Sequence, residues 1–134
     1  MLKHNLKVYG KNPECLSYFC SDFLKIEPFK TDAMIICPPW GGIDLSEYSF
    51  RDLDEIMNPK LSDILNHGLK FSKNIMLQMP KNTNIENLLK VFIECNIKPI
   101  FTIEKIMTNN KVSQLFIYIG DEKFTRMRNS QLYL

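Results

Sequence analysis

Residues 33–42 read AMIICPPWGG, an unbroken apolar run that ends in two prolines, a tryptophan and two glycines. Such a run is typical of a strand that is buried on both faces of a parallel sheet. Pro38 and Pro39 end the strand abruptly, because neither has an N–H to donate to a ladder. The segment therefore predicts a buried strand over 33–37 that is followed at once by a rigid turn.

The sequence on both sides of this strand alternates between strand and helix patterns. Before the strand over 33–37, the sequence predicts a helix over 2–9, a strand over 16–20 and a turn over 21–24. After it, the sequence predicts an irregular surface segment over 43–57, a helix from Asn58-Pro59 to about residue 71, a strand over 74–80 and a helix capped by Asn84. Two last strands are predicted over 98–107 and 112–120, joined by a turn at Asn109-Asn110. This alternation implies an α/β class with a mostly parallel sheet and a C-terminal antiparallel β-hairpin. Residues 1–134 are predicted to form one domain, with a loose tail over 121–134.

Composition and charge exclude several classes of protein. Of the 134 residues, 45% are hydrophobic and 24% are charged, as in a globular domain. Lys plus Arg number 17 and Asp plus Glu number 15, so the net charge is +2. This charge is too low for a protein that binds nucleic acid without regard to sequence through a strongly basic stripe, but it is compatible with a pocket for one nucleotide. No apolar run approaches the roughly 20 residues of a membrane span, and residues 1–7 lack the apolar region of a signal peptide.

The cysteines point to a reducing compartment. The chain has 4 of them, with no CxxC pair, and most lie in apolar stretches. This pattern predicts buried, reduced thiols rather than disulfides or zinc ligands, and favours the cytosol or the nucleus.

Three predicted turns place candidate binding groups along one edge of the sheet. Ligands of such sheets bind at the carboxyl ends of the parallel strands, which here are the turns at Asp22, 38–40 and 80–82. The prolines fix the direction of the carbonyls that begin at Cys37, and Trp40 offers a flat surface beside them. This combination suits a planar base, with stacking on one face and carbonyl acceptors at an exocyclic amine. The alternative is a proline-rich loop with a core tryptophan.

The turn at 38–40 resembles the (D/N/S)-P-P-(Y/F/W) motif of S-adenosylmethionine-dependent methyltransferases that act on exocyclic amines of bases. Its longer form, PPWGG, is similar to the motif of the trimethylguanosine synthase family of RNA cap guanine-N2 methyltransferases. Four further stretches match in the family's order, namely NLKVYG at 5–10, SDF at 21–23, the segment from NI to MPKN over 74–82, and IGD at 119–121. The resemblance thus covers nearly the whole chain.

The resemblance implies a role for each matched residue. The implied site residues are Cys37, Pro38, Pro39 and Trp40 for catalysis; Trp40, Asn5, Lys81 and Asn82 for the substrate; and Asp22 and Phe23 for the cofactor. Trp40 would stack on the positively charged 7-methylguanine of capped RNA, and the carbonyls of Cys37 and Pro38 would accept from its N2 amine. Asp22 would accept from the adenine amine of S-adenosylmethionine. The implied reaction is an in-line methyl transfer that needs no metal.

Each of these residues also has an ordinary interpretation outside the resemblance. Asp22 is a common turn residue, Phe23 a core residue and Lys81 a solvated charge. Cys37 could be read as a nucleophile, but a structural cysteine in a buried strand is the better interpretation.

The match begins inside a helix of the family's domain. The resemblance therefore implies a partial, Rossmann-like class I methyltransferase fold that lacks the first two strands and the glycine-rich cofactor loop. Cys37 stands where the family has Ser, Asp or Asn, and Lys81 stands where it has Arg, so the phosphate contact lacks a bidentate fork. We expect a C-terminal part of the catalytic domain, which a second chain or the N-terminal half would complete.

Several functional alternatives stay open at this point. The leading hypothesis is methylation of the cap guanine in the nucleus, with the cytoplasm as an additional location, and with capped RNA rather than a membrane as the partner. The alternatives are a non-catalytic remnant that binds the cap or RNA, and a methyltransferase that acts on another nucleobase amine. The sequence leaves open whether this chain is active by itself.

Overall fold

The computed structural model describes residues 8–10, 12, 14, 17, 20–40, 51–98 and 100–126. Its elements, in chain order, are the 3-10 helix η2 (Phe23–Lys25), β1 (Met34–Ile36), α2 (Leu53–Ile56), α3 (Leu61–Phe71), β2 (Ile75–Pro80), α4 (Ile85–Glu94), β3 (Phe101–Thr108), β4 (Lys111–Ile119) and α5 (Glu122–Arg126). This mixture of helices and one sheet confirms the predicted α/β class. The predicted helix over 2–9 and strand over 16–20 lie largely outside the described residues.

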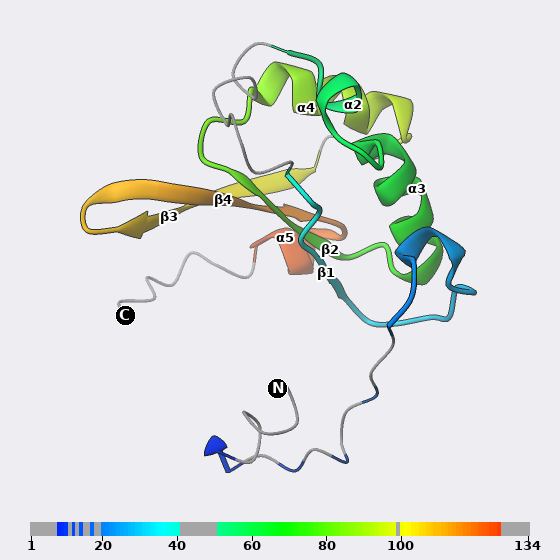
Figure 1. Cartoon of the computed structure of the whole chain (residues 1–134). Helices are drawn as coiled ribbons and strands as arrows, with labels where there is room; N and C mark the ends of the chain where they lie inside the picture. The colour runs from blue at the N-terminus through cyan, green and yellow to red at the C-terminus, as the bar shows by residue number, and fades with distance from the viewer. Residues whose placement is uncertain are drawn as a thin grey trace.

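The four strands form one sheet in the order β1-β2-β4-β3 (Figure 1). β1 pairs with β2 in parallel, and β4 is antiparallel to both β2 and β3. β1, β2 and β3 therefore run in the same direction, while two of the three pairings are antiparallel. Among the described strands, the pairing of β1 with β2 is parallel as expected, and both antiparallel pairings involve β4 of the predicted C-terminal hairpin. Because β4 is the more apolar strand of the hairpin, it takes the interior position and leaves β3 at the edge.

Local sequence chemistry explains the elements that were predicted well. The side chain of Asn84 caps α4 by accepting from the N–H groups of Glu86 and Asn87. Asn109 and Asn110 have φ values of 50° and 59°, which the two-residue turn of a β-hairpin requires.

Helices α2, α3 and α4 cover one face of the sheet (Figure 1), and the core lies between them and the strands. The central strands contribute alternate side chains, and the helices contribute their apolar stripes. The fully buried members include Ile75, Leu77, Met79, Ile117, Leu61, Leu65 and Leu88. Each such side chain stabilises the fold by roughly 1.5–3 kcal/mol relative to an exposed position. No described helix has both the length and the apolar character that a membrane crossing needs.

β1 differs from its prediction. Ile36 is 7% exposed and points to the helices, whereas Ile35 is 71% exposed. The strand is therefore buried on one face, because among the described residues only the face toward α3 is covered. An apolar run alone cannot tell these two situations apart.

Three other local predictions need correction. The segment expected to be irregular over 43–57 contains α2, and Leu53 within it is fully buried. Helix α3 begins at Leu61 rather than at Pro59, and its N-cap Lys60 makes no side-chain capping bond. The expected loose tail begins with α5, where the Asp121 carboxylate accepts from the N–H of Phe124 at 2.9 Å. Residues 127–134 lie outside the described residues.

Candidate functional site

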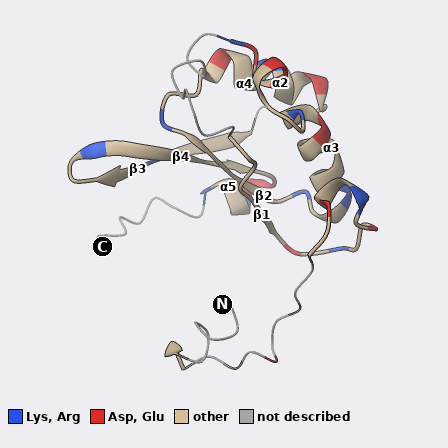
Figure 2. Cartoon of the chain, in the orientation of Figure 1, with Lys and Arg blue, Asp and Glu red and all other residues tan. Residues whose placement is uncertain are grey.

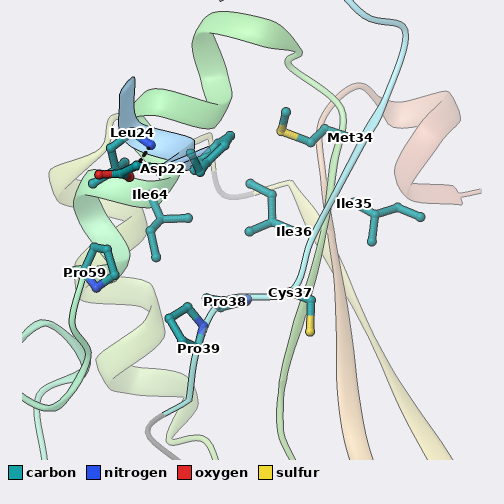
Figure 3. Close-up of a pocket in the computed structure, with 11 residues that line it drawn as sticks. Asp22, Leu24, Met34, Ile35, Ile36, Cys37, Pro38, Pro39, Pro59 and Ile64 are labelled. Atoms are coloured by element: carbon teal, nitrogen blue, oxygen red, sulfur yellow. Dashed lines mark hydrogen bonds between the residues drawn. The ribbon is translucent and has the colours of Figure 1, made fainter. Parts of the chain in front are cut away.

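A pocket of about 430 Å³ lies at the carboxyl end of β1, between β1, η2 and α3 (Figure 3). Its lining consists of residues 22–24 on one side, 34–39 on the other, and Pro59 and Ile64. Figure 3 shows Ile36 and Pro39 turned toward Ile64 and Pro59, and Ile35 turned away. The lining is almost entirely apolar, and Asp22 is the one charged side chain among the described lining residues.

Asp22 starts η2 and organises the turn. Its Oδ1 accepts from the N–H of Leu24 at 3.1 Å. Its Oδ2 lies 3.5 Å from Nζ of Lys25, in an exposed ion pair of the kind that contributes little stability. One carboxylate oxygen therefore fixes the turn, while the other faces solvent and can accept from a ligand amine.

Phe23 and His67 anchor this turn to α3. The Phe23 ring lies 5.0 Å from the His67 ring, edge to face, and 5.8 Å from the Phe71 ring, stacked. Nε2 of His67 lies 3.1 Å from the Ile26 carbonyl, so the tautomer with the proton on Nε2 donates this bond. Sequence reasoning missed His67. The available signal was its position on the apolar stripe of α3, three residues after Ile64.

Trp40 completes the hydrogen bonding of β2 where β1 ends. The N–H of Met34 donates to the Asn74 carbonyl at 2.9 Å. This bond determines which backbone groups of β1 and β2 face each other farther along the two strands. Continued to the end of β1, this pattern places the Gln78 carbonyl opposite position 38, which is a proline and has no N–H to donate. The indole Nε1–H of Trp40 donates to the Gln78 carbonyl instead, at 3.1 Å. The indole is thereby held in one orientation at the carboxyl end of β2.

The same hydrogen-bond pattern does not use the carbonyls of Cys37 and Pro38 at the end of β1. Cys37 alternates with Ile36, so its backbone groups face the side of β1 away from β2. The carbonyl of Pro38 faces position 80, and Pro80 has no N–H to offer it. The β1–β2 ladder therefore uses neither carbonyl.

The turn after β2 carries two further predicted residues. Lys81 is exposed and Asn82 is partly buried. Thr83 closes the turn, because its N–H and its Oγ1 both donate to the Pro80 carbonyl, at 3.1 and 2.9 Å. These residues do not line the pocket, but they follow the strand whose Gln78 holds Trp40.

The structure thus divides the predicted site residues into two neighbouring groups. The pocket brings Asp22 and Phe23 together with residues 37–39. Trp40, Lys81 and Asn82 belong to the adjoining end of β2. Asn5 lies outside the described residues.

The cysteines differ from their prediction. Cys20 and Cys37 are exposed, while Cys95 is buried and Cys15 lies outside the described residues. Cys37 is exposed because it follows Ile35 by two positions on the uncovered side of β1. Burial raises the pKa of Cys95 to about 11, and the charge of Asp54 adds to the effect. Within the described ranges, no three His, Cys, Asp or Glu residues form a group that could hold a metal ion.

Comparison with known proteins finds a matching family and several similar curated proteins. The model of a family described as RNA cap guanine-N2 methyltransferase matches residues 1–122. The chain is 30% identical over 95 residues to the trimethylguanosine synthase of Schizosaccharomyces pombe. This alignment covers 66% of this chain and 39% of that protein. The chain is 29% identical over 65 residues to the trimethylguanosine synthase of Saccharomyces cerevisiae, which covers 48% of this chain and 21% of that protein. The matched regions span well under half the length of both relatives.

Proposed function

Because the chain belongs to the RNA cap guanine-N2 methyltransferase family, we propose that it carries the adenine- and base-binding side of a site for methyl transfer from S-adenosylmethionine to N2 of the 7-methylguanosine cap of RNA. One observation carries the proposal. The pocket unites Asp22 and Phe23 with residues 37–39, and the fixed indole of Trp40 lies at the end of the neighbouring strand. A mixed α/β sheet of this kind is consistent with a methyltransferase-like fold. The proposed location is the nucleus, with the cytoplasm as an additional one, because the family's capped substrates are consistent with nuclear function.

The pocket fits the adenine end of the cofactor in size and chemistry. Its volume of about 430 Å³ lies within the usual range for small-molecule sites. The apolar side chains of Phe23, Ile36 and Ile64 can enclose a flat ring, and Oδ2 of Asp22, which pairs with the exposed Lys25 ammonium, can also accept from an amine at the rim. When bound, the cofactor supplies a methyl group on a sulfonium. The strands and glycine-rich loop that the family resemblance implies would complete its site, from an N-terminal portion or from a second chain.

The residues at the end of β1 would position the nucleophile. One of the two carbonyls at this end, that of Cys37 or that of Pro38, would accept from the guanine N2 amine and so orient its nitrogen toward the methyl donor. Trp40 would stack on the cationic 7-methylguanine, an interaction of about 1–2 kcal/mol. Lys81 would meet the cap phosphates as a point charge.

Calorimetry with S-adenosylhomocysteine tests the cofactor half of the proposal. We expect the protein to bind S-adenosylhomocysteine and to bind S-inosylhomocysteine at least about tenfold more weakly, because the latter presents a carbonyl where Asp22 requires an amine. Equal binding of both ligands by the folded protein would remove Asp22 from the adenine site. Absence of binding to either ligand would remove the cofactor site from this chain.

A cap-binding role without catalysis is the second candidate function. It is favoured by the hydrogen bond of Trp40 to Gln78, which fixes the indole through β2 rather than through the cofactor pocket. Binding of 7-methylguanosine diphosphate without binding of S-adenosylhomocysteine would assign this role. Preference for an adenine or cytosine nucleotide over the cap nucleotide would instead indicate a methyltransferase of another base amine.

A further inference from the structure

The β3–β4 hairpin extends from the sheet at the same edge as the candidate site (Figure 1). β3 runs in the same direction as β1 and β2, so its carboxyl end and the turn at 109–110 belong to the carboxyl edge. In Figure 1 the tip of the hairpin lies beyond the helices that cover the rest of the sheet. The outer part of the hairpin is therefore an arm next to the proposed cap site, whereas the inner part of β4 belongs to the core.

The outer part of this arm carries positive charge only. Within residues 105–114 the charged side chains are Lys105 and Lys111, and both are exposed. Glu104, the next carboxylate along β3, accepts from the hydroxyl of Tyr118 at 2.8 Å. Figure 2 shows basic positions on the hairpin and on the turn after β2, and several acidic positions over α2, α3 and α4. The outer hairpin and the turn with Lys81 thus carry basic side chains, while most of the charged side chains of α2, α3 and α4 are acidic.

A β-bulge in β4 changes the direction of the strand pair near the tip of the arm. Ile106 pairs with Gln114 and Met107 pairs with Val112, so Ser113 is the extra residue on β4. Its Oγ donates to the Ile106 carbonyl at 3.0 Å and stabilises the irregularity. Bulges of this kind bend a strand pair and increase its twist. The bend lies between Lys105 and Lys111, so it sets the direction in which the outer lysine is presented.

We propose that this arm is a second contact site for the RNA substrate, at which Lys105 on the core-facing side of the hairpin and Lys111 on the opposite side bind phosphodiesters of the nucleotides that follow the cap. From β1 to β3 the sheet spans three strand spacings, or about 14 Å, which a few nucleotides can bridge. A strand of RNA that leaves Trp40 and passes Lys81 would reach the hairpin next. The inference rests on the proposed function for the position of the cap.

The chemistry of the arm favours the RNA backbone over base recognition. Lysine ammonium groups are hydrated point charges without a fixed fork, so they bind phosphates in many orientations. Such contacts position a nucleic acid but do not read its sequence. The exposed amides of Asn109 and Asn110 can add hydrogen bonds to phosphate or sugar oxygens. We therefore expect binding that depends on RNA length and salt but not on sequence.

The test compares three ligands on matched variants. Binding is measured for a capped RNA of ten nucleotides, the same RNA without a cap, and 7-methylguanosine diphosphate. The variant is Lys105→Gln/Lys111→Gln, and the control is Lys98→Gln/Lys123→Gln, which removes the same charge at the opposite end of the hairpin strands. A further variant, Lys105→Arg/Lys111→Arg, retains the charge.

The hairpin variant should bind both RNAs about tenfold more weakly and the cap nucleotide unchanged. The slope of log K against log salt should fall by about 1.4, that is about 0.7 for each of two lost phosphate contacts. The control pair and the arginine variant should bind like the wild type.

Three results would overturn the inference: wild-type affinity for RNA in the hairpin variant, an equal loss in the control pair, or no RNA binding by the wild-type protein. Failure of the proposed function gives a different result. In that case neither the cap nucleotide nor S-adenosylhomocysteine binds, while both RNAs still bind in a way that depends on the hairpin.

Discussion

The two parallel strands of the sheet differ in their support. β2 has a partner on each side, and its residues Ile75, Leu77 and Met79 are fully buried. β1 has one partner among the described strands and consists of three residues, of which Ile35 is 71% exposed. The pocket lies at the end of β1, the less supported strand, while the Gln78 carbonyl of β2 holds the Trp40 indole beside it. Stability and binding therefore depend on different residues.

Truncation of the core should give the largest effect on stability. Leu77→Ala removes a fully buried side chain from the centre of β2 and should lower the free energy of unfolding by about 2–5 kcal/mol. Ile35→Thr, one strand away, should change it by no more than about 0.5 kcal/mol. Urea denaturation of both variants measures the difference. Similar losses in the two variants would show that β1 is covered as thoroughly as β2.

Removal of the indole N–H should have an intermediate effect. Trp40→Phe keeps an aromatic ring but leaves the Gln78 carbonyl without its donor, which should destabilise the protein by about 1–2 kcal/mol. The weaker stacking of phenylalanine should also reduce the affinity for 7-methylguanosine diphosphate several-fold. Denaturation and calorimetry measure the two effects. An unchanged stability would mean that the bond to Gln78 does not hold the ring.

The cysteines should distinguish the two regions by reactivity and pH. Burial raises the pKa of Cys95 from 9.0 to about 11, so the folded state holds this proton more tightly than the unfolded state does. Its contribution to stability is present below about pH 9 and is lost as the pH rises toward 11. At pH 8, iodoacetamide should label the exposed Cys37 in the folded protein and leave Cys95 unmodified. Mass spectrometry after brief labelling checks this, and equal labelling would contradict the burial of Cys95.

Substitution of Asp22 should have the smallest effect on stability. Serine is about as good an N-cap as aspartate, so Asp22→Ser can still accept from the N–H of Leu24 and should alter stability by no more than about 0.5 kcal/mol. The variant lacks the second carboxylate oxygen and should bind S-adenosylhomocysteine about tenfold more weakly. Calorimetry beside a denaturation curve separates the two effects. A loss of stability without a loss of affinity would make Asp22 a purely structural residue.

Elements that depend on local chemistry were predictable from the sequence. The amide of Asn84 can cap only the helix that follows it, and consecutive asparagines tolerate the positive φ of the hairpin turn. The apolar spacing over α3 and the run over β2 similarly identify a helix and a strand without reference to other segments. Of the three turns predicted to lie along one edge, those at 22–23 and 37–39 line one pocket, whereas the turn at 80–82 does not line it.

Features that depend on distant segments were not predictable. The exposure of Ile35 depends on what lies beside β1, and an apolar run carries no information about that. The insertion of β4 beside β2 is a choice between two strands of one hairpin, which depends on how much apolar surface each can bury. The bond from Trp40 to Gln78 requires the register of β1 against β2, and the contact of His67 with Ile26 joins residues 41 positions apart.

Fluorescence of Trp40 offers the clearest test of the proposed base site, because it is the only tryptophan in the chain. The protein is titrated with 7-methylguanosine diphosphate and, separately, with guanosine diphosphate. Stacking on a cationic base predicts saturable quenching by the methylated nucleotide and at least about tenfold weaker quenching by the unmethylated one. Equal quenching by the two nucleotides, or none by either in the folded protein, would contradict the assignment of Trp40 as the receptor of the cap.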